Sequence, residues 1–129
     1  MRAFGLAIGA ATLVAVQTAA AESRIEHALQ MLAPAERLEQ LCDYTAMLRI
    51  RKGSGHFRPD RAIANATAEP RIRHDTIVAK GGAFRSRGKW YALAYTCTAT
   101  PDSMAVVSFQ YKVGAEIPQA KWASYGLWQ

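Results

Sequence analysis

Hydrophobic residues between positions 23 and 48 recur every three or four positions, a spacing that predicts amphipathic helices. Ser23 is followed three residues later by Glu26, a capping-box pattern, so we expect a short helix to begin there and to end near Ala33-Pro34. Pro34 suits the first turn of a second helix. The stripe of this helix predicted to be buried comprises Leu38, Leu41, Cys42, Thr45 and Leu48. The residues expected on its soluble outer face are Glu36, Glu39, Gln40 and Asp43.

Beyond Pro59 the hydrophobic period changes to two, which is typical of strands. The preceding residues, 51–59, contain two glycines and a proline and are predicted to form a loop. We expect strands at 62–68, 72–79, 89–100 and 107–113. Glu69-Pro70 and residues 101–103 are predicted turns, and Gly81-Gly82 is a hairpin signal.

Large side chains alternate with small or polar ones along the last two predicted strands. One face of them carries Tyr91, Leu93, Tyr95, Cys97, Val107, Phe109, Tyr111 and Val113. This face should cover the helix stripe, so we predict an α+β fold in which N-terminal helices pack on an antiparallel meander sheet of about four strands. Trp122, Tyr125 and Trp128 form a C-terminal aromatic segment that is expected to seal a sheet edge or the mouth of the core; the alternative is a platform on which a ligand stacks.

The first 21 residues resemble a secretory signal peptide. Met1-Arg2 supplies positive charge, Ala3–Gln17 is uncharged, and Ala19-Ala20-Ala21 offers the small residues that signal peptidase recognises. We therefore expect cleavage after Ala21, a single domain over residues 22–129, and a periplasmic or secreted location. An uncleaved membrane anchor is the alternative, although the uncharged stretch is shorter than the ~20 apolar residues of a spanning helix.

The two cysteines of the chain are Cys42 and Cys97. In an exported protein a disulfide between them is the expected state, and it would join the two predicted core faces. Redox catalysis is not expected, because the sequence has no C-x-x-C spacing.

Positive charge is concentrated in the middle of the chain. The formal net charge is +6, but residues 49–89 alone contain eleven lysines and arginines against three acids, a net charge of +8. The residues that we expect to project to a common side of their strands, and that form a hypothetical anion-binding site, are Arg71, Arg73, Arg85, Arg87 and Lys89. A solvated strand face without a ligand is the alternative interpretation. Export makes lipid phosphate, lipopolysaccharide, cell-wall carboxylates or an acidic protein more plausible partners than nucleic acid.

Enzymatic patterns are weak. Ser54, His56 and Asp60 are residue types that hydrolases use, but no G-x-S-x-G motif accompanies them. His74 and Asp75 could join His56 and Asp60 as metal ligands, but the sequence contains no H-x-x-x-H or comparable spacing of metal ligands. We therefore predict neither a metal nor another cofactor. The sequence favours a non-catalytic envelope binding domain with a basic face. The alternative is a small periplasmic hydrolase or inhibitor-like domain that uses the Gly53–Arg61 loop.

Four segments carry a resemblance to a known family. They are Arg37–Cys42, Ala83–Tyr91, Tyr95–Thr98 and Tyr125–Trp128. Together they resemble an alphaproteobacterial family known as domain of unknown function 930, over about Arg37–Gln129. The resemblance implies an exported envelope protein of a bacterium related to the rhizobia, and it implies no activity, substrate or catalytic residue.

Overall fold

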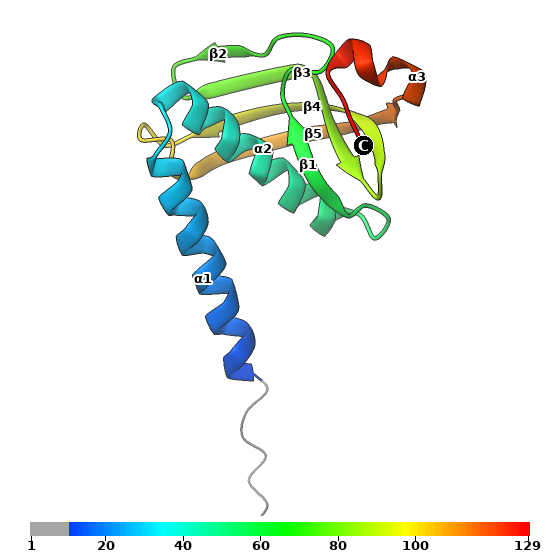
Figure 1. The fold of residues 1–129 in the computed structure, drawn as a ribbon. Coiled ribbons are helices and arrows are strands. Elements are labelled where there is room, and N and C mark those ends of the chain that lie inside the picture. Colours follow the sequence, from blue (N-terminus) through cyan, green and yellow to red (C-terminus); the bar gives the residue numbers. More distant parts are fainter. Residues whose placement is uncertain (1–10) are drawn as a thin grey trace, which may run out of the picture.

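Two helices precede five strands in the computed structural model, which describes residues 11–129 and the side chains from residue 18 onward (Figure 1). The elements are α1 (Ala11–Gln30), α2 (Pro34–Gly53), β1 (Pro59–Ile63), β2 (Arg71–Arg73), β3 (Thr76–Ser86), β4 (Lys89–Ala99), β5 (Val106–Glu116), α3 (Gln119–Trp122) and the 3-10 turn η1 (Ala123–Tyr125). Helix α2 lies across one face of the sheet, and the N-terminal half of α1 extends away from it. The predicted α+β architecture is confirmed.

The sheet is antiparallel throughout residues 59–116, with the strand order β1-β3-β4-β5. Strand β3 is long enough to pair with two strands on the same edge: β1 lies against its second half and β2 against its first half. The two long strands predicted at 89–100 and 107–113 are confirmed as β4 and β5, and residues 101–103 form the predicted turn between them.

The main core lies between α2 and the sheet. Its largest cluster includes Leu38, Leu41, Cys42, Ala46 and Ile50 from α2 and Ile77, Phe84, Leu93, Tyr95 and Cys97 from β3 and β4. The predicted helix stripe is correct as far as Cys42. Leu48, however, is 48% exposed, because the buried face continues through Ala46 and Ile50 instead.

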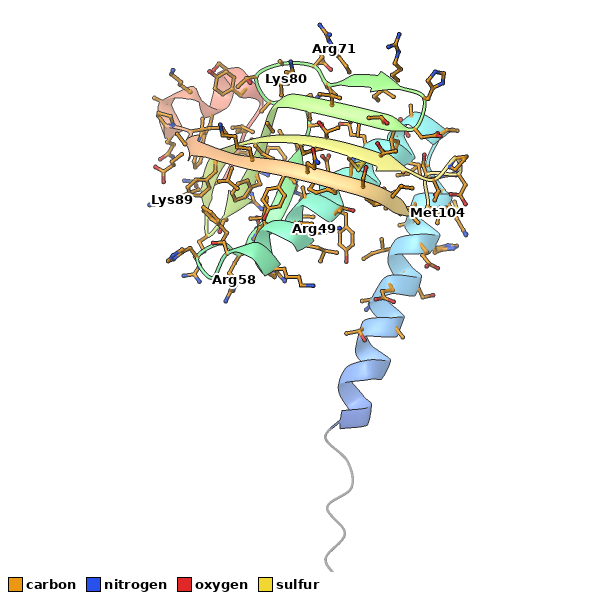
Figure 2. All side chains as sticks on the ribbon, turned by 180° about the vertical axis from the view of Figure 1, so that it is seen from behind. Arg49, Arg58, Arg71, Lys80, Lys89 and Met104 are labelled. Carbon is orange, nitrogen blue, oxygen red and sulfur yellow. A yellow bond between two sulfur atoms is a disulfide. The ribbon has the colours of Figure 1, made fainter. Side chains whose placement is uncertain are left out.

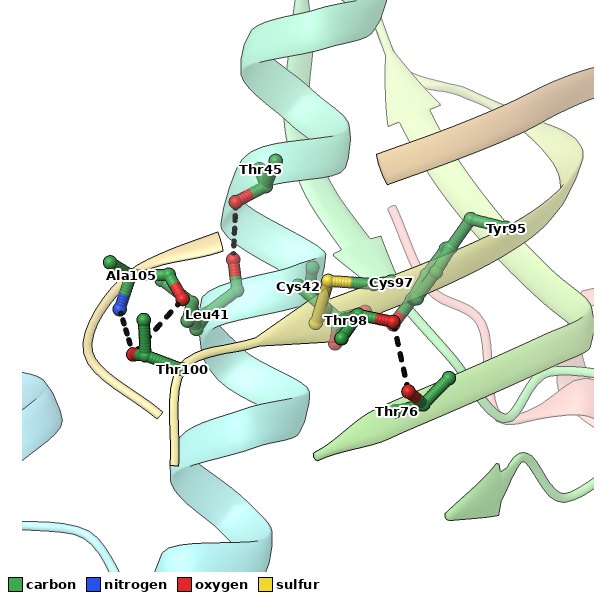
Figure 3. The surroundings of a disulfide bond; sticks show 10 residues. Leu41, Cys42, Thr45, Thr76, Tyr95, Cys97, Thr98, Thr100 and Ala105 are labelled. Carbon is green, nitrogen blue, oxygen red and sulfur yellow. Dashed lines mark hydrogen bonds between the residues drawn. A yellow bond between two sulfur atoms is a disulfide. The ribbon is translucent and has the colours of Figure 1, made fainter. Parts of the chain in front are cut away.

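A disulfide joins Cys42 of α2 to Cys97 of β4 inside this core, as predicted (Figure 3). Both cysteines are fully buried, and their Cα atoms lie 6.0 Å apart. The bond therefore fixes which side of α2 faces the sheet.

A second, smaller cluster lies on the opposite face of the sheet. It consists of Ala83, Trp90, Ile117, Trp122 and Leu127. The indole N–H of Trp90 donates to the backbone oxygen of Trp128 at 2.7 Å, and that of Trp122 donates to the oxygen of Ile117 at 2.9 Å. The C-terminal aromatic segment thus packs within the molecule, but it covers one end of this sheet face rather than a sheet edge or the mouth of the main core.

The predicted strand at 62–68 and the hairpin at Gly81-Gly82 are wrong. Strand β1 ends at Ile63, and the glycine pair lies inside β3, where the register with β4 shifts between Ala79 and Gly82. Glycine is needed there because a Cβ on Gly81 would lie 2.5 Å from the backbone nitrogen of Ala68. The hairpin turn is Arg87-Gly88, whose φ angles of 52° and 75° are those that a two-residue turn between antiparallel strands favours.

The predicted helix boundaries also need correction. No break occurs at Ser23, because α1 runs continuously from Ala11 to Gln30. Residues 1–10 of the predicted signal peptide lie outside the described residues. Helix α2 continues to Gly53, five residues beyond the predicted stripe, and the N–H of Ser54 closes its last turn on the oxygen of Ile50.

Asp43 is the largest departure from the predicted pattern, which placed it on the soluble face of the helix. Its side chain is buried and only 4% of the residue is exposed, because it follows Cys42 on the side of α2 that faces the sheet. The Tyr95 hydroxyl donates a hydrogen bond to its Oδ1 at 2.7 Å. Burial raises the pKa of Asp43 to about 7; the Tyr95 hydrogen bond opposes this shift, and the nearby Glu39 charge adds to it.

Replacing both cysteines tests the covalent link. The disulfide closes a segment with a sequence separation of 55 residues, for which the chain-entropy model gives about 4 kcal/mol. We expect Cys42→Ala/Cys97→Ala to lower the free energy of unfolding in urea by about that amount. Reduction of the wild type should have a similar effect and reduction of the double variant none. Equal stability of oxidised and reduced wild type would contradict this role.

Replacing Asp43 tests its buried charge. Because its pKa in the folded protein is raised to about 7, stability that is present below its ordinary pKa of 3.8 is lost as the pH rises toward 7. We expect the free energy of unfolding of the wild type to fall relative to Asp43→Asn by on the order of 2 kcal/mol between pH 5 and pH 8. Urea titrations at both pH values measure this difference, and a constant difference would refute it.

Candidate functional site

The sheet face opposite α2 is open at the end where β2 lies. Residues directly opposite each other on paired antiparallel strands share a face, so the register shows which side chains meet there. One row runs from Arg73 through Thr76 and Thr98 to Ser108, and the next runs from Arg71 through Val78 and Thr96 to Gln110. The hydroxyl groups of Thr76 and Thr98 are 2.8 Å apart, which confirms that they point to the same side.

We call this surface the open sheet face. Its residues are Arg71, Arg73, Thr76, Val78, Lys80, Ala94, Thr96, Thr98, Ser108, Gln110 and Lys112. A hollow of about 290 Å³ over β3, β4 and β5 includes Lys80 and Lys112, and a second hollow at the β2 edge includes both arginines. The face remains open because its β4 and β5 positions are small or polar and offer no hydrophobic surface for another layer.

Four cations lie on the open sheet face, and none of its residues is acidic. They are Arg71, Arg73, Lys80 and Lys112, all of them exposed. The ion pairs found among residues 18–129 join other residues, so these four charges have no acidic partner within that part of the chain. Arg71 and Lys80 lie along the same edge of the molecule, whereas Lys89 and Arg58 lie elsewhere (Figure 2). The face therefore combines free positive charge with hydroxyl and amide donors, which suits anionic groups.

The predicted cluster of five basic residues is divided by the fold. Arg71 and Arg73 lie on the open sheet face, but the expectation that Arg85, Arg87 and Lys89 share one strand face is wrong, because the Arg87-Gly88 turn separates β3 from β4. Lys89 lies 3.6 Å from Glu116, across the β4–β5 pair. Of Arg85, Arg87 and Lys89, only Arg87, at the tip of the turn, has an exposed charge without an ion pair in residues 18–129.

Arg85 has a structural environment. Its Nε and an Nη atom each donate to Asp60 at 2.9 Å, and its side chain is only 15% exposed. The guanidinium lies 5.8 Å from the ring centroid of Trp90 and 6.0 Å from that of Trp128. The hydrogen bonds from Arg85 lower the pKa of Asp60, so the pair stays ionised. Arg85 thus fastens β1 and β3 to the C-terminal segment.

The Gly53–Arg61 region does not bring its hydrolase residue types together. The Ser54 hydroxyl oxygen accepts a hydrogen bond from the backbone N–H of His56 at 3.1 Å, and Asp60 is occupied by Arg85. No side-chain hydrogen bond connects Ser54, His56 and Asp60, so the described loop contains no paired nucleophile and base.

Sequence reasoning missed Lys80 and Lys112. Lys112 falls at the period of Ser108 and Gln110, so its face is readable from the sequence, but its distance from Arg71 depends on a strand order that the sequence does not show. The sequence predicts Lys80 beside a hairpin turn at Gly81-Gly82, whereas these glycines lie inside β3.

Within residues 11–129, no helix is both long and apolar enough to cross a membrane. In the same part of the chain, no three His, Cys, Asp or Glu side chains gather as metal ligands would.

A family model described as Domain of Unknown Function (DUF930) matches residues 29–127. No curated protein and no solved structure matches the chain.

Substituting single arginines should separate the structural ones from the free ones. We expect Arg85→Gln to lower the free energy of unfolding by about 1–2 kcal/mol, since it removes a two-point ion pair and contacts with two indole rings. Arg71→Gln should change it by less than about 0.5 kcal/mol, because its side chain is free. Chemical denaturation of both variants provides the comparison; equal losses would show that the two arginines do not differ.

Proposed function

The chain belongs to the domain of unknown function 930 family, and we propose that it is a non-catalytic binding protein of the cell envelope whose open sheet face holds an anionic partner. The observation that supports this proposal is the group of four unpaired cations, Arg71, Arg73, Lys80 and Lys112, on a surface without acids. By contrast, Arg85 is not part of the proposed binding surface, because Asp60 neutralises it.

The chemistry of the face favours phosphate or carboxylate groups. Guanidinium groups donate two parallel hydrogen bonds to such anions, and lysines add mobile positive charge. The cations are spread over β2, β3 and β5 rather than gathered in one deep pocket. This arrangement fits a partner with repeated anionic groups, such as a layer of lipid phosphates, lipopolysaccharide or the cell wall, better than it fits a single small anion.

A periplasmic or secreted location is part of the proposal. The disulfide supports it, because such bonds persist in oxidising compartments and are rare in the cytosol. The signal-like sequence before Glu22 supports it independently. In such a compartment lipid phosphates and cell-wall polymers are abundant, whereas nucleic acid is not.

Vesicle binding tests the proposal. Protein recovered from the periplasm of an expression host is sedimented with vesicles of phosphatidylglycerol and phosphatidylcholine, with cell-wall fragments tested in parallel. We expect binding to an anionic preparation at low salt that weakens steeply at high salt, since surface charges are screened. The variant Arg71→Gln/Arg73→Gln/Lys80→Gln/Lys112→Gln should bind at least about tenfold more weakly, because it removes every cation of the open sheet face.

The control variant removes two arginines and two lysines from other surfaces. It is Lys52→Gln/Arg58→Gln/Arg87→Gln/Lys121→Gln, which changes the net charge by the same amount. It should retain most of the binding. If both variants lose binding equally, net charge rather than the open sheet face is responsible. Binding that persists unchanged in high salt would also defeat the electrostatic proposal.

A further inference from the structure

A pocket of about 220 Å³ lies on the helix side of the sheet, away from the open sheet face. Its walls come from α1, α2 and β1. The lining residues from α1 and from the turn that follows it are apolar, namely Ile25, Ala28, Leu29 and Leu32. Helix α2 contributes Gln40, Asp43, Tyr44 and Met47, and β1 contributes Asp60, Arg61 and Ala62. The pocket is thus mainly hydrophobic and contains a few polar groups, as small-molecule sites do.

Asp43 is the buried acidic group in the wall of this pocket, and one of its oxygens is available to a ligand. One of its carboxylate oxygens accepts the hydrogen bond from Tyr95, and no second hydrogen bond reaches the side chain. Every fully buried polar side-chain atom in residues 18–129 has a partner, so the other Asp43 oxygen must retain accessible surface. Because the residue as a whole is almost completely buried, the pocket is where this oxygen is reached.

The other charged groups around Asp43 leave its carboxylate without a cation. Asp60 is bonded to Arg85, and the Arg61 guanidinium lies 5.8 Å from the Trp128 ring centroid, on the opposite face of the sheet. Glu39, one helical turn before Asp43, adds negative charge, and Tyr95 is the titratable group facing it from β4. A buried carboxylate without a cation is unfavourable, as the raised pKa of Asp43 indicates. A ligand that brought a positive charge would relieve this cost.

An adjoining hollow of about 390 Å³ extends the negative surface. It shares Ala28, Leu32 and Gln40 with the pocket and adds Glu36 and Glu39. Both glutamates lie on the same helix as Asp43, one and two turns before it. A cation approaching the crevice between α1 and α2 therefore meets carboxylates before it reaches the pocket.

We propose that this pocket binds a short aliphatic amine. The ammonium group donates a hydrogen bond to the free oxygen of Asp43, and the hydrocarbon chain packs against Leu29, Met47 and Ala62. The hydroxyl group of Tyr95 fixes the carboxylate by holding its other oxygen. This site lies across the sheet from the anion-binding face and does not depend on it.

Titration calorimetry with pentylamine and pentan-1-ol tests the proposal, using the exported protein at pH 8. The alcohol has nearly the same shape as the amine but no charge, so we expect it to bind at least tenfold more weakly. Asp43→Asn should weaken amine binding at least tenfold, whereas Glu26→Gln, an exposed acid-to-amide change on α1 outside the pocket lining, should leave it within twofold. Binding should also weaken at least tenfold from pH 8 to pH 5, because protonation of Asp43 removes the charge that the ammonium pairs with.

A second variant separates binding from stability. Ala28→Phe fills the pocket from the exposed side of α1 without changing any charge, and it should abolish amine binding while the protein stays folded by circular dichroism. The fourfold variant of the open sheet face should bind pentylamine as the wild type does, which distinguishes this site from the proposed function. Equal binding of amine and alcohol, unchanged binding in Asp43→Asn, or no amine binding at millimolar concentration would overturn the proposal.

Discussion

The attachment of α2 to β4 through Cys42 and Cys97 is the constraint on which the rest of the structure depends. A helix can bury only one side, and the disulfide fixes that side against the strand that carries Tyr95 and Leu93. Once α2 covers this face, the described residues that cover the opposite face come from the short C-terminal segment and, at Ala66, from the loop after β1. That segment reaches Ala83 and Trp90 but not β2, and the open sheet face is the part that remains.

The same attachment separates the charges of the molecule. Residues 34–43 of α2 carry Glu36, Glu39 and Asp43 on or near the crevice with α1, while the cations of β2, β3 and β5 lie on the other face of the sheet. The sheet itself lies between the carboxylates and the cations. Because none of the residues of the open sheet face is acidic, its cations have no carboxylate to pair with on that face. The C-terminal segment contributes to this arrangement by covering Trp90 at the other end of the face.

The sequence was sufficient to predict the elements whose hydrophobic period is strong. Strands β4 and β5, the buried stripe of α2 through Cys42, and the disulfide all follow from spacing and from the pairing of two cysteines. The sequence failed where a local signal had two structural outcomes. A Gly-Gly pair such as Gly81-Gly82 occurs both in turns and in strands that another segment of the backbone approaches closely. The second case applies here, because the backbone of Ala68 lies against Gly81. Asp43 was expected on the soluble face because its side chain is polar, but it is buried next to Cys42. Its hydrogen-bond partner Tyr95 is 52 residues away in the sequence, so the local pattern does not reveal the contact.

The candidate site shows why a count of charges is a poor guide to a binding surface. Five basic residues were expected to act together, yet Arg85 is closely paired with Asp60 and Lys89 forms an ion pair with Glu116, so both interact within the molecule. Lys80 and Lys112 join Arg71 and Arg73 because the strand order places β2, β3, β4 and β5 side by side in one sheet. Whether an arginine binds a partner or holds the fold together is decided by the presence of a carboxylate on the neighbouring strand. That presence depends on register, which the hydrophobic pattern of a single chain specifies only after the turns have been placed correctly.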